Sequence, residues 1–296
     1  MRLLITGANG HLGIRLIRRI NETRPNDEVV AIVRSEKAAA SLRQEGLEVN
    51  IRVVSYTDSA GINLAGQGAE VIIHLVGIIK ESAANTFEMA HQKTSAALVE
   101  ANLDASHIVT LGILGSEHSS DNSCFVSRAA SDAILQAGPI PTTVIRVPMV
   151  LGPGDYASRA LAKNGASGLA LCFRSSSLEQ PIYSMDVVDA IMSAVSLIPA
   201  DRIIELAGPE SLTRKALIER AGRLLVNKPT VISLPIALGY LLAWILEKTS
   251  SNPPVTRAML GVLDHDDAIN TRAATNLLGL TLTPLDEMLR NVLTDG

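Results

Sequence analysis

Short apolar runs alternate with helical periods through the first half of the chain. Nearly continuous β-branched runs indicate strands buried on both faces, as in parallel sheets. The runs cover Arg2–Thr6, Val29–Val33, Val49–Val54, Val71–Val76, Ile108–Leu111 and Thr143–Val147. Helical periods lie between them, in a stretch beginning near His11 and in Glu36–Gln44, Thr86–Asn102 and Val126–Gln136. This alternation predicts an α/β fold, a Rossmann-like doubly wound parallel sheet with right-handed crossovers and helices on both faces.

The pattern changes after Val150, where Gly152-Pro153-Gly154-Asp155 interrupts the chain. The remainder is mostly helical with a few short strands. Helices are predicted at Ser211–Leu225, with Ser211 or Thr213 as N-cap, at Pro235–Lys248, and from Thr283 onward. We therefore expect a dinucleotide-binding domain over residues 1–150, with a returning segment near 181–200. A smaller, mostly helical C-terminal lobe for a substrate or partner is expected over residues 151–296.

A glycine-rich turn, Thr6-Gly7-Ala8-Asn9-Gly10-His11-Leu12-Gly13, follows the first predicted strand and opens a helical stretch. This setting is typical of a Rossmann dinucleotide site, although a purely structural turn is the alternative. Gly7 would permit the tight turn, Gly10 would leave room for the pyrophosphate, and Gly13 would let the helix approach the sheet. Backbone N–H groups at the helix start would hold the phosphates. The expected cofactor-binding residues here are Gly7, Asn9, Gly10, His11, Leu12 and Gly13.

The end of the second predicted strand indicates which dinucleotide is bound. An NAD site usually has Asp or Glu at this point for the ribose 2′-hydroxyl. No carboxylate occurs between Val29 and Ser35, and the strand ends in Arg34 and Ser35 instead. Arg34 can pair with a 2′-phosphate and Ser35 can donate to it, which favours NADP(H) over NAD(H). The alternative for Arg34 is a solvated side chain at a strand end.

Composition excludes several classes of partner. With 47% hydrophobic and 19% charged residues, the chain of 296 residues is an ordinary globular protein. A net charge of −4 and few aromatic residues argue against nucleic acid as a partner. Cys124 and Cys172 are far apart and have no metal-ligand spacing, so no metal is expected and a reducing compartment is indicated.

The sequence shows no pattern typical of a targeting or membrane-spanning segment. The first residues lack the features of a secretory signal. The most apolar later stretch, Val231–Leu246, is shorter than the about 20 residues that span a bilayer. We expect a cytoplasmic protein without a transmembrane segment, with membrane association through a partner as an alternative.

Four further segments carry a family resemblance. They are His74-Leu75-Val76-Gly77, Arg146-Val147-Pro148, Gly152-Pro153-Gly154-Asp155 and Tyr183–Ala190. Together with the glycine turn, and in the same order, they resemble motifs of the extended and atypical short-chain dehydrogenase/reductase superfamily, which includes epimerases and dehydratases. The resemblance implies that the dinucleotide also contacts Tyr56, Leu75, Val76, Gly77 and Pro148.

A narrower resemblance is visible within that superfamily. Leu75–Ile78, Thr86-Phe87-Glu88 and His91 are similar to the branch that contains the nucleotide-binding accessory subunit of mitochondrial complex I and its bacterial relatives. Several loose C-terminal motifs, including Leu234-Pro235 and Leu282–Leu285, are similar to the same branch. The resemblance implies a role in holding a nucleotide and presenting the C-terminal lobe to a partner.

The sequence departs from the superfamily at its catalytic positions. Active members use a Ser after the fifth strand and a Tyr-x-x-x-Lys on the next helix, where the Tyr is the general acid/base. Here Gly112 stands for the Ser, Cys124 for the Tyr and Arg128 for the Lys. Arg128 keeps the positive charge and could hold the nicotinamide ribose, or it could form a surface salt bridge. The catalytic residues are therefore unknown from the sequence, and the standard carbonyl–hydride mechanism lacks support.

Two functions remain compatible with these residues. The first is an NADP(H)-binding or redox-sensing protein with little standard turnover. The second is an enzyme, an NADP-dependent oxidoreductase or isomerase acting on a lipophilic carbonyl or quinone, because hydride transfer belongs chiefly to the cofactor. The helix at Pro235–Lys248 is apolar on more than one face, so it could meet a protein partner, a lipid surface or a small lipophilic substrate, or lie in the core. The sequence leaves the substrate, the partner and the oligomeric state open.

Overall fold

The computed structural model describes residues 1–293, which form two compact units. Unit 1 comprises Met1–Ile78, Asn85–Arg146 and Val188–Ile204. Unit 2 comprises Ile79–Ala84, Val147–Val187 and residues 205–293. The domain boundaries expected from the sequence stay a prediction, and each unit is described below by itself.

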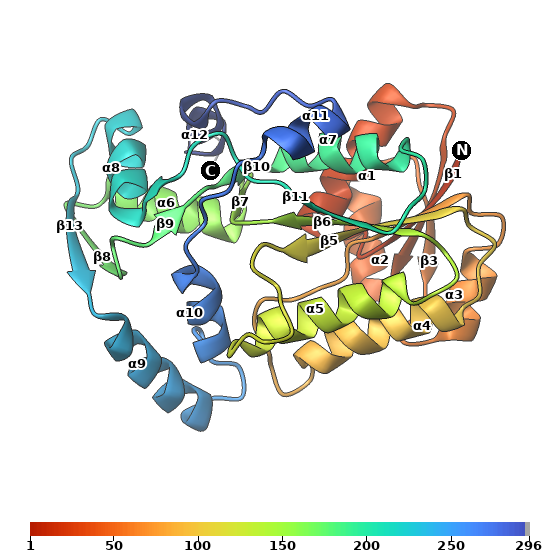
Figure 1. Ribbon diagram of the computed structural model, residues 1–296, viewed down its shortest axis with the longest axis horizontal. Helices are drawn as coiled ribbons and strands as arrows, with labels where there is room; N and C mark the ends of the chain where they lie inside the picture. Colours follow the sequence, from red (N-terminus) through yellow and green to blue (C-terminus); the bar gives the residue numbers. More distant parts are fainter. Residues whose placement is uncertain (294–296) are drawn as a thin grey trace. The chain divides into compact units, whose positions relative to one another are not determined.

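A seven-stranded sheet in the order β11-β6-β5-β4-β1-β2-β3 forms the centre of unit 1 (Figure 1). The pairs β1–β2, β1–β4, β2–β3 and β4–β5 are parallel. The predicted doubly wound α/β fold is confirmed. The strands are β1 (Arg2–Thr6), β2 (Glu28–Val33), β3 (Asn50–Val53), β4 (Val71–His74), β5 (His107–Ile113), β6 (Thr142–Val147) and β11 (Arg202–Glu205).

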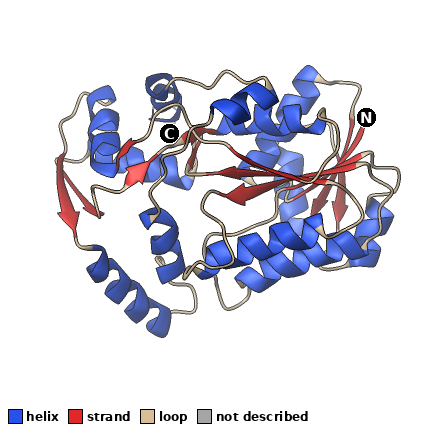
Figure 2. Ribbon diagram, viewed as in Figure 1, coloured by secondary structure: helices blue, strands red, loops and turns tan. Residues whose placement is uncertain are grey.

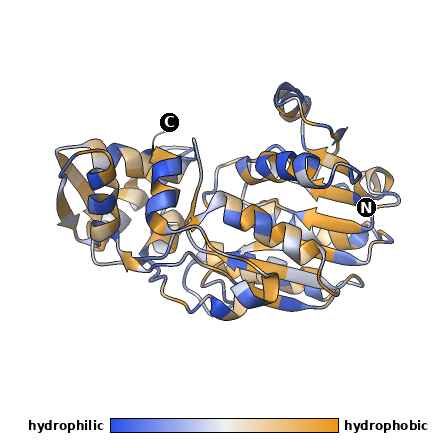
Figure 3. Cartoon of the chain, turned by 90° about the horizontal axis from the view of Figure 1, so that it is seen from above, coloured by the Kyte–Doolittle hydropathy of each residue, from blue (hydrophilic) through white to orange (hydrophobic). Residues whose placement is uncertain are grey.

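Helices lie on both faces of this sheet (Figure 2). They are α1 (His11–Thr23), α2 (Glu36–Gln44), α3 (Ser59–Ala65), η1 (Glu88–Lys93), α4 (Thr94–Glu100), α5 (Ser123–Gln136) and α7 (Ser184–Val195). The central strands are orange in the hydropathy colouring of Figure 3, and they are buried because helices cover both sides of the sheet. On α1, the one-sided row Gly13, Leu16, Ile17 and Ile20 is buried as its helical spacing predicts.

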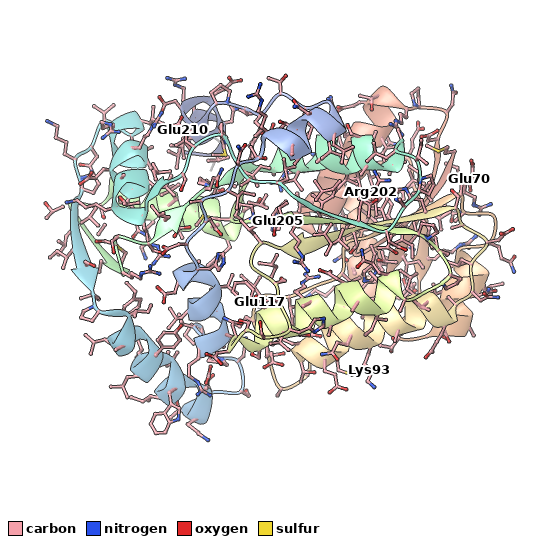
Figure 4. All side chains as sticks on the ribbon, viewed as in Figure 1. Glu70, Lys93, Glu117, Arg202, Glu205 and Glu210 are labelled. Atoms are coloured by element: carbon pink, nitrogen blue, oxygen red, sulfur yellow. The ribbon has the colours of Figure 1, made fainter. Side chains whose placement is uncertain are left out.

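Two elements of unit 1 differ from the sequence expectation. Strand β4 ends at His74, so Leu75 and Val76 belong to the following loop. The predicted helix over 86–102 is divided into the π-helical η1 and α4. The turn of a π-helix is wider than that of an α-helix. The Thr94 hydroxyl donates to the Ala90 and His91 carbonyls of this turn, at 2.9 and 3.1 Å, and so gives both carbonyls a hydrogen-bond partner. Figure 4 shows Lys93 at the end of η1, pointing away from the sheet.

Unit 2 combines short strands with helices. Its strands are β7 (Val150–Leu151), β8 (Leu169–Phe173), β9 (Leu178–Glu179), β10 (Ile182–Tyr183), β12 (Leu212–Thr213) and β13 (Thr230–Leu234), paired as β10–β7, β12–β9 and β13–β8. Its helices are α6 (Tyr156–Ala166), α8 (Arg214–Leu224), α9 (Ile236–Thr249), α10 (Arg257–Asp264), α11 (Arg272–Leu278) and α12 (Leu285–Leu293). The core lies where α6, α8 and α12 meet. The helix expected over Ser211–Leu225 begins later, because Leu212 and Thr213 pair as a strand and Thr213 caps α8.

An ion pair is buried at the start of α8. The Arg214 Nε donates to Glu179 Oε1 at 2.7 Å, and the Glu179 carboxylate is almost fully buried on β9. Burial raises the pKa of Glu179 to about 7, although the Arg214 charge opposes the rise. The stability of unit 2 therefore depends on the protonation of a group that titrates near neutrality.

Candidate cofactor site

The turn between β1 and α1 is shaped by its glycines. Gly7 has a positive φ of 74°, and a Cβ there would lie 2.9 Å from the Leu75 carbonyl carbon, just beyond β4. A Cβ at Gly13 would lie 2.5 Å from the Ala8 carbonyl oxygen, so the first turn of α1 could not close against the loop. Both positions need glycine for reasons internal to the protein.

Gly10 differs from these two. A Cβ at Gly10 would meet only the Gly7 carbonyl oxygen, at 3.3 Å, so close packing within the protein does not explain the glycine. Gly10 is also the N-cap residue of α1 and supplies no side-chain cap to the first N–H groups of the helix. An open approach to uncapped backbone donors fits a pyrophosphate. Asn9, His11 and Leu12 lie in the same turn, at the positions that the sequence motif predicts for cofactor contacts.

Arg34 and Ser35 follow the end of β2. The Arg34 side chain is exposed and forms no ion pair with any residue between 1 and 293. The Ser35 hydroxyl oxygen accepts from the Ala38 N–H at 3.2 Å and thereby caps α2, which leaves its proton to donate elsewhere. The pair can therefore offer a cation and a hydroxyl donor to a phosphate beside this strand end.

Tyr56 lies beside the glycine turn. Its hydroxyl donates to the Ile32 carbonyl at 3.4 Å. Burial raises the pKa of Tyr56 above its usual value. The polar end of this side chain thus has a partner within the chain, and the predicted contact with adenine stays a prediction that involves its ring.

Arg128 lies at the point where β4 and β5 stop pairing. Its Nη1 donates to the Val76 and Leu111 carbonyls, at 3.3 and 3.4 Å, one residue or two beyond the last paired positions of the strands. The guanidinium covers Gly77 so closely that a Cβ at Gly77 would coincide with it. Of the two alternatives for Arg128, the surface salt bridge is not found, because Arg128 is partly buried and has no carboxylate partner within residues 1–293.

The Arg128 cation is incompletely satisfied. Its Nε is buried without a hydrogen-bond partner among the described residues. Burial lowers the pKa of Arg128 from its usual value, while Cys124 and Asp132 nearby oppose that shift. A partly buried guanidinium with spare donor capacity, next to the β4 loop, is suited to hold an electronegative group of a bound molecule.

Two buried histidines lie near this cation. Burial and the Arg128 charge lower the pKa values of His74 and His91 to about 3 each. The Nδ1 of His74 lies 2.7 Å from the Thr6 hydroxyl, whereas its Nε2 is buried without a partner among the described residues. Both imidazoles are therefore neutral near pH 7, and Arg128 carries the positive charge of this cluster.

From the sequence, His91 stands out only as part of a family motif. In the structure its Nε2 lies 3.0 Å from the Ile78 carbonyl oxygen, its Nδ1 lies 3.2 Å from the Ser127 hydroxyl, and its ring stacks on Phe87. It links η1, α5 and the β4 loop. The hydrogen-bond partners of His91 are 13 and 36 residues away in the chain. Helical or strand periodicity in the sequence therefore could not predict these contacts.

The usual Ser and Tyr positions are filled or enclosed. A Cβ at Gly112 would lie 2.8 Å from Cγ of Arg146, which is held by Asp132 at 2.9 Å. Cys124 is 0% exposed at the start of α5, and its Sγ lies 3.8 Å from the Ile78 carbonyl oxygen. Neither position presents a hydroxyl or thiol at an open surface. The sequence did not predict that Arg146 fills the space beside Gly112.

The remaining predictions concern loops, metals and membranes. Leu75, Val76 and Gly77 lie together in the β4 loop, whereas Pro148 belongs to unit 2 and its cofactor contact stays a prediction. Among residues 1–293, no group of three His, Cys, Asp or Glu side chains could hold a metal ion. In the same range, no helix has both the length and the apolar character needed to cross a membrane.

Comparison with known proteins gives similarities at several levels. The model of a family described as NAD(P)H-binding matches residues 7–165. A ceramide reductase from Caulobacter vibrioides is 27% identical over 235 residues, which cover 78% of this chain and 73% of the relative. Quinone oxidoreductase 2 of Escherichia coli is 37% identical over 71 residues, 24% of each protein.

Solved structures extend the similarity to nearly the whole chain. The NADPH-dependent quinone oxidoreductase of Escherichia coli, solved in complex with NADPH, has a TM-score of 0.73 at 20% identity, over 97% of this chain and 98% of that one. UDP-glucuronic acid 4-epimerase from Bacillus cereus, solved with UDP-glucuronic acid and NAD, has a TM-score of 0.74 at 16% identity, over 100% and 98% of the two chains. At such identities these two structures show a common fold.

Proposed function

Because the chain belongs to the NAD(P)H-binding family of Rossmann-type proteins, we propose that it is an NADP(H)-dependent oxidoreductase acting on a lipophilic carbonyl or quinone. The observation that carries the proposal is Arg128, a partly buried cation without an ion-pair partner in residues 1–293, covering Gly77 in the β4 loop. The enzyme works without the Ser, Tyr and Lys of the superfamily, since Gly112, Cys124 and Arg128 stand in their places.

The choice of NADP(H) rests on the end of β2. Arg34 is exposed and uncommitted to any residue of the described chain, and Ser35 has a proton to donate. The quinone oxidoreductase solved with NADPH supports this preference, while the epimerase solved with NAD shows that the fold accepts either cofactor. The proposed contacts are Gly7, Asn9, Gly10, His11, Leu12, Gly13, Arg34, Ser35, Tyr56, Leu75, Val76, Gly77, Arg128 and Pro148.

The residues of the chain bind and orient the dinucleotide and the acceptor, and Arg128 contributes a positive charge. A bound reduced dinucleotide supplies a hydride. Arg128 holds the ribose hydroxyls or the acceptor oxygen, where its fixed charge stabilises developing negative charge in a site of low dielectric. His74 and His91 are neutral near pH 7 because their pKa values are about 3, so neither is a proton donor. The proton that completes reduction therefore comes from water.

The acceptor class is inferred from the relatives together with the missing acid. One relative is named for ceramide and another for quinones, and both names describe lipophilic compounds. A sugar-nucleotide epimerisation would need a tyrosine to remove and return a hydroxyl proton, and Cys124 occupies that position. These points support reduction of a lipophilic acceptor.

The test follows absorbance of the reduced cofactor with a panel of quinones, aldehydes and ketones. NADPH oxidation by the unmodified protein is expected with at least one lipophilic acceptor. Arg128→Met should lower kcat/KM at least about tenfold, because it removes one charge-assisted hydrogen bond. Arg128→Lys should recover part of the lost kcat/KM. Arg18→Met is the control, because Arg18 is exposed and pairs with Glu45 on the protein surface. Turnover unchanged in Arg128→Met would refute the role given to Arg128.

A second candidate function is an NADP(H)-binding or redox-sensing protein with little turnover. The enclosed Cys124 and the filled space beside Gly112 favour it, because neither offers acid–base chemistry to a substrate. Tight NADPH binding without oxidation of NADPH by any acceptor of the panel would establish this function in place of the oxidoreductase.

A further inference from the structure

Helix α9 of unit 2 buries its small residues and exposes its large apolar ones. Its protected side carries the small residues Gly239 and Ala243. Its solvent side carries five large apolar side chains, each 44–54% exposed, which we call the α9 apolar face: Leu238, Leu241, Leu242, Trp244 and Ile245. A surface helix of a globular protein normally shows the opposite arrangement, with large apolar residues inside and charges outside.

The helix is nevertheless firmly packed. A Cβ at Gly239 would lie 3.2 Å from the Phe173 ring and 3.3 Å from Leu260, so this glycine lets α9 lie close to β8 and α10. Glu247 accepts from the backbone N–H and from Nε of Arg257, at 2.7 and 2.8 Å, and thus ties α9 to α10, beside which it lies in Figure 1. The five side chains face outward because the small residues hold the other side of the helix.

Neighbouring elements add to the exposed apolar surface. On β8, Leu169 and Leu171 are exposed and alternate with the buried Ala170 and Cys172. Because Phe173 shares the side of Leu169 and Leu171, and packs on Gly239, this row leads to the protected side of α9. The outer row of β8 is therefore an apolar strip separate from the α9 apolar face.

The C-terminal end of α9 carries a small excess of positive charge, whereas the rest of the helix is uncharged. From Ile236 to Leu246 the helix contains no Asp, Glu, Lys or Arg. Lys248 is exposed in its last turn, and Lys80 donates to Asn252 just beyond the helix at 2.9 Å. With the Glu247–Arg257 pair and Glu81, this end carries three cations and two anions, and hence one positive charge in excess.

We infer that the α9 apolar face docks on the surface of a lipid bilayer. The helix has 14 residues, about 21 Å, which is too short to cross a hydrocarbon core of about 30 Å but suits a helix lying in the interface. Leucine, isoleucine and tryptophan are the side chains that interfacial helices insert, and the lysine at the end of α9 can meet the headgroups. A bilayer is also where a lipophilic acceptor is dissolved, although docking does not depend on turnover.

The area favours a bilayer over a second copy of the chain. Five half-exposed large side chains present on the order of 400 Å² of apolar surface, using the sizes usual for such residues. A stable protein interface needs about 800 Å² from each partner. Insertion of the same side chains into a bilayer needs no complementary shape, so the smaller area is sufficient.

Trp244 provides a direct measurement, because it is the only tryptophan in the chain. The probes are phosphatidylcholine vesicles with and without phosphatidylglycerol, added to the full chain. We expect co-sedimentation with the vesicles, a blue shift of Trp244 fluorescence, and quenching by brominated phosphatidylcholine. With one cation in excess, the anionic lipid should strengthen binding only about fivefold.

Variants connect the binding to the α9 apolar face. Leu241→Ser combined with Ile245→Ser should weaken vesicle binding at least about tenfold. Leu64→Ser combined with Ile198→Ser is the matched control, because these side chains are 72% and 84% exposed outside α9, and it should bind as the unmodified protein does.

Three results would overturn the inference. One is unchanged Trp244 fluorescence and quenching with saturating vesicles, measured on the unmodified protein and therefore independent of how a variant folds. The second is equal loss of binding in the control variant. The third is dimerisation abolished by the α9 substitutions in the absence of vesicle binding. NADPH binding and NADPH oxidation in solution are measured without vesicles and do not depend on any of these three results. Failure of this inference is therefore distinguishable from failure of the proposed function.

Discussion

Arg34→Ala offers a sharp test of cofactor selection. The Arg34 side chain is exposed at the end of β2 and has no ion-pair partner in residues 1–293, so its removal breaks no salt bridge of the described structure. The substitution should therefore leave the free energy of unfolding within about 0.5 kcal/mol of the unmodified value, as for other surface changes. Its effect on cofactor binding can then be interpreted as loss of a direct contact.

The magnitude follows from the contact expected with a 2′-phosphate. A hydrogen bond to a charged group contributes about 1.5–3 kcal/mol, which corresponds to roughly 10–150-fold in Kd. The lower end applies here, because Arg34 is exposed and salt screens exposed charges. Arg34→Ala should thus raise the Kd for NADPH about tenfold and leave the Kd for NADH almost unchanged, since NADH lacks the phosphate.

Isothermal titration calorimetry with both cofactors measures this difference directly. Arg43→Ala is the matched control, because Arg43 is an exposed arginine on α2 whose partner is Glu36, at 3.9 Å. It should change neither Kd. Equal weakening of NADPH and NADH binding by Arg34→Ala, or tighter binding of NADH than of NADPH by the unmodified protein, would refute the reasoning.

Two further predictions concern stability. Gly112→Ser should destabilise the protein by about 1–3 kcal/mol in urea unfolding, because the added side chain meets Arg146 and Val144, and it should not create activity; a stable, more active variant would contradict this geometry. Stability should fall as pH decreases from about 6.5 to about 3, because the unfolded chain binds protons that His74 and His91, with folded-state pKa values of about 3, exclude. Glu179, whose folded-state pKa is about 7, has the opposite effect on stability between about pH 4.5 and 7, because the folded protein binds a proton there that the unfolded chain does not. Urea midpoints across this range should therefore depend less on pH in His91→Gln and more steeply on pH in Glu179→Gln.

The sequence predicted the sheet and the glycine turn well, because both depend on local patterns. Continuous apolar runs identify buried strands, and the spacing of Gly7, Gly10 and Gly13 identifies the turn between a strand and a helix. The short strands of unit 2 were harder to locate. Two-residue strands such as β9 and β12 are too short to show a period, and pairing between distant segments defines them.

The surroundings of Arg128 could not be predicted in the same way. Its sequence neighbours gave no reason to expect burial, since the carbonyls it bonds belong to strand β5 and to the β4 loop, 17 and 52 residues away. The space beside Gly112 is likewise filled by Arg146 from another strand. Departures from a family motif show which groups are missing, whereas the long-range packing determines what has replaced them.

The guanidinium of Arg128 occupies the volume that a side chain at Gly77 would need. The two positions are consequently coupled: alanine at 77 would require the end of the Arg128 side chain to move away, whereas a shorter residue at 128 would leave glycine at 77 without a clash. Gly77→Ala would therefore redirect the Arg128 cation away from the loop where the proposed cofactor contacts lie.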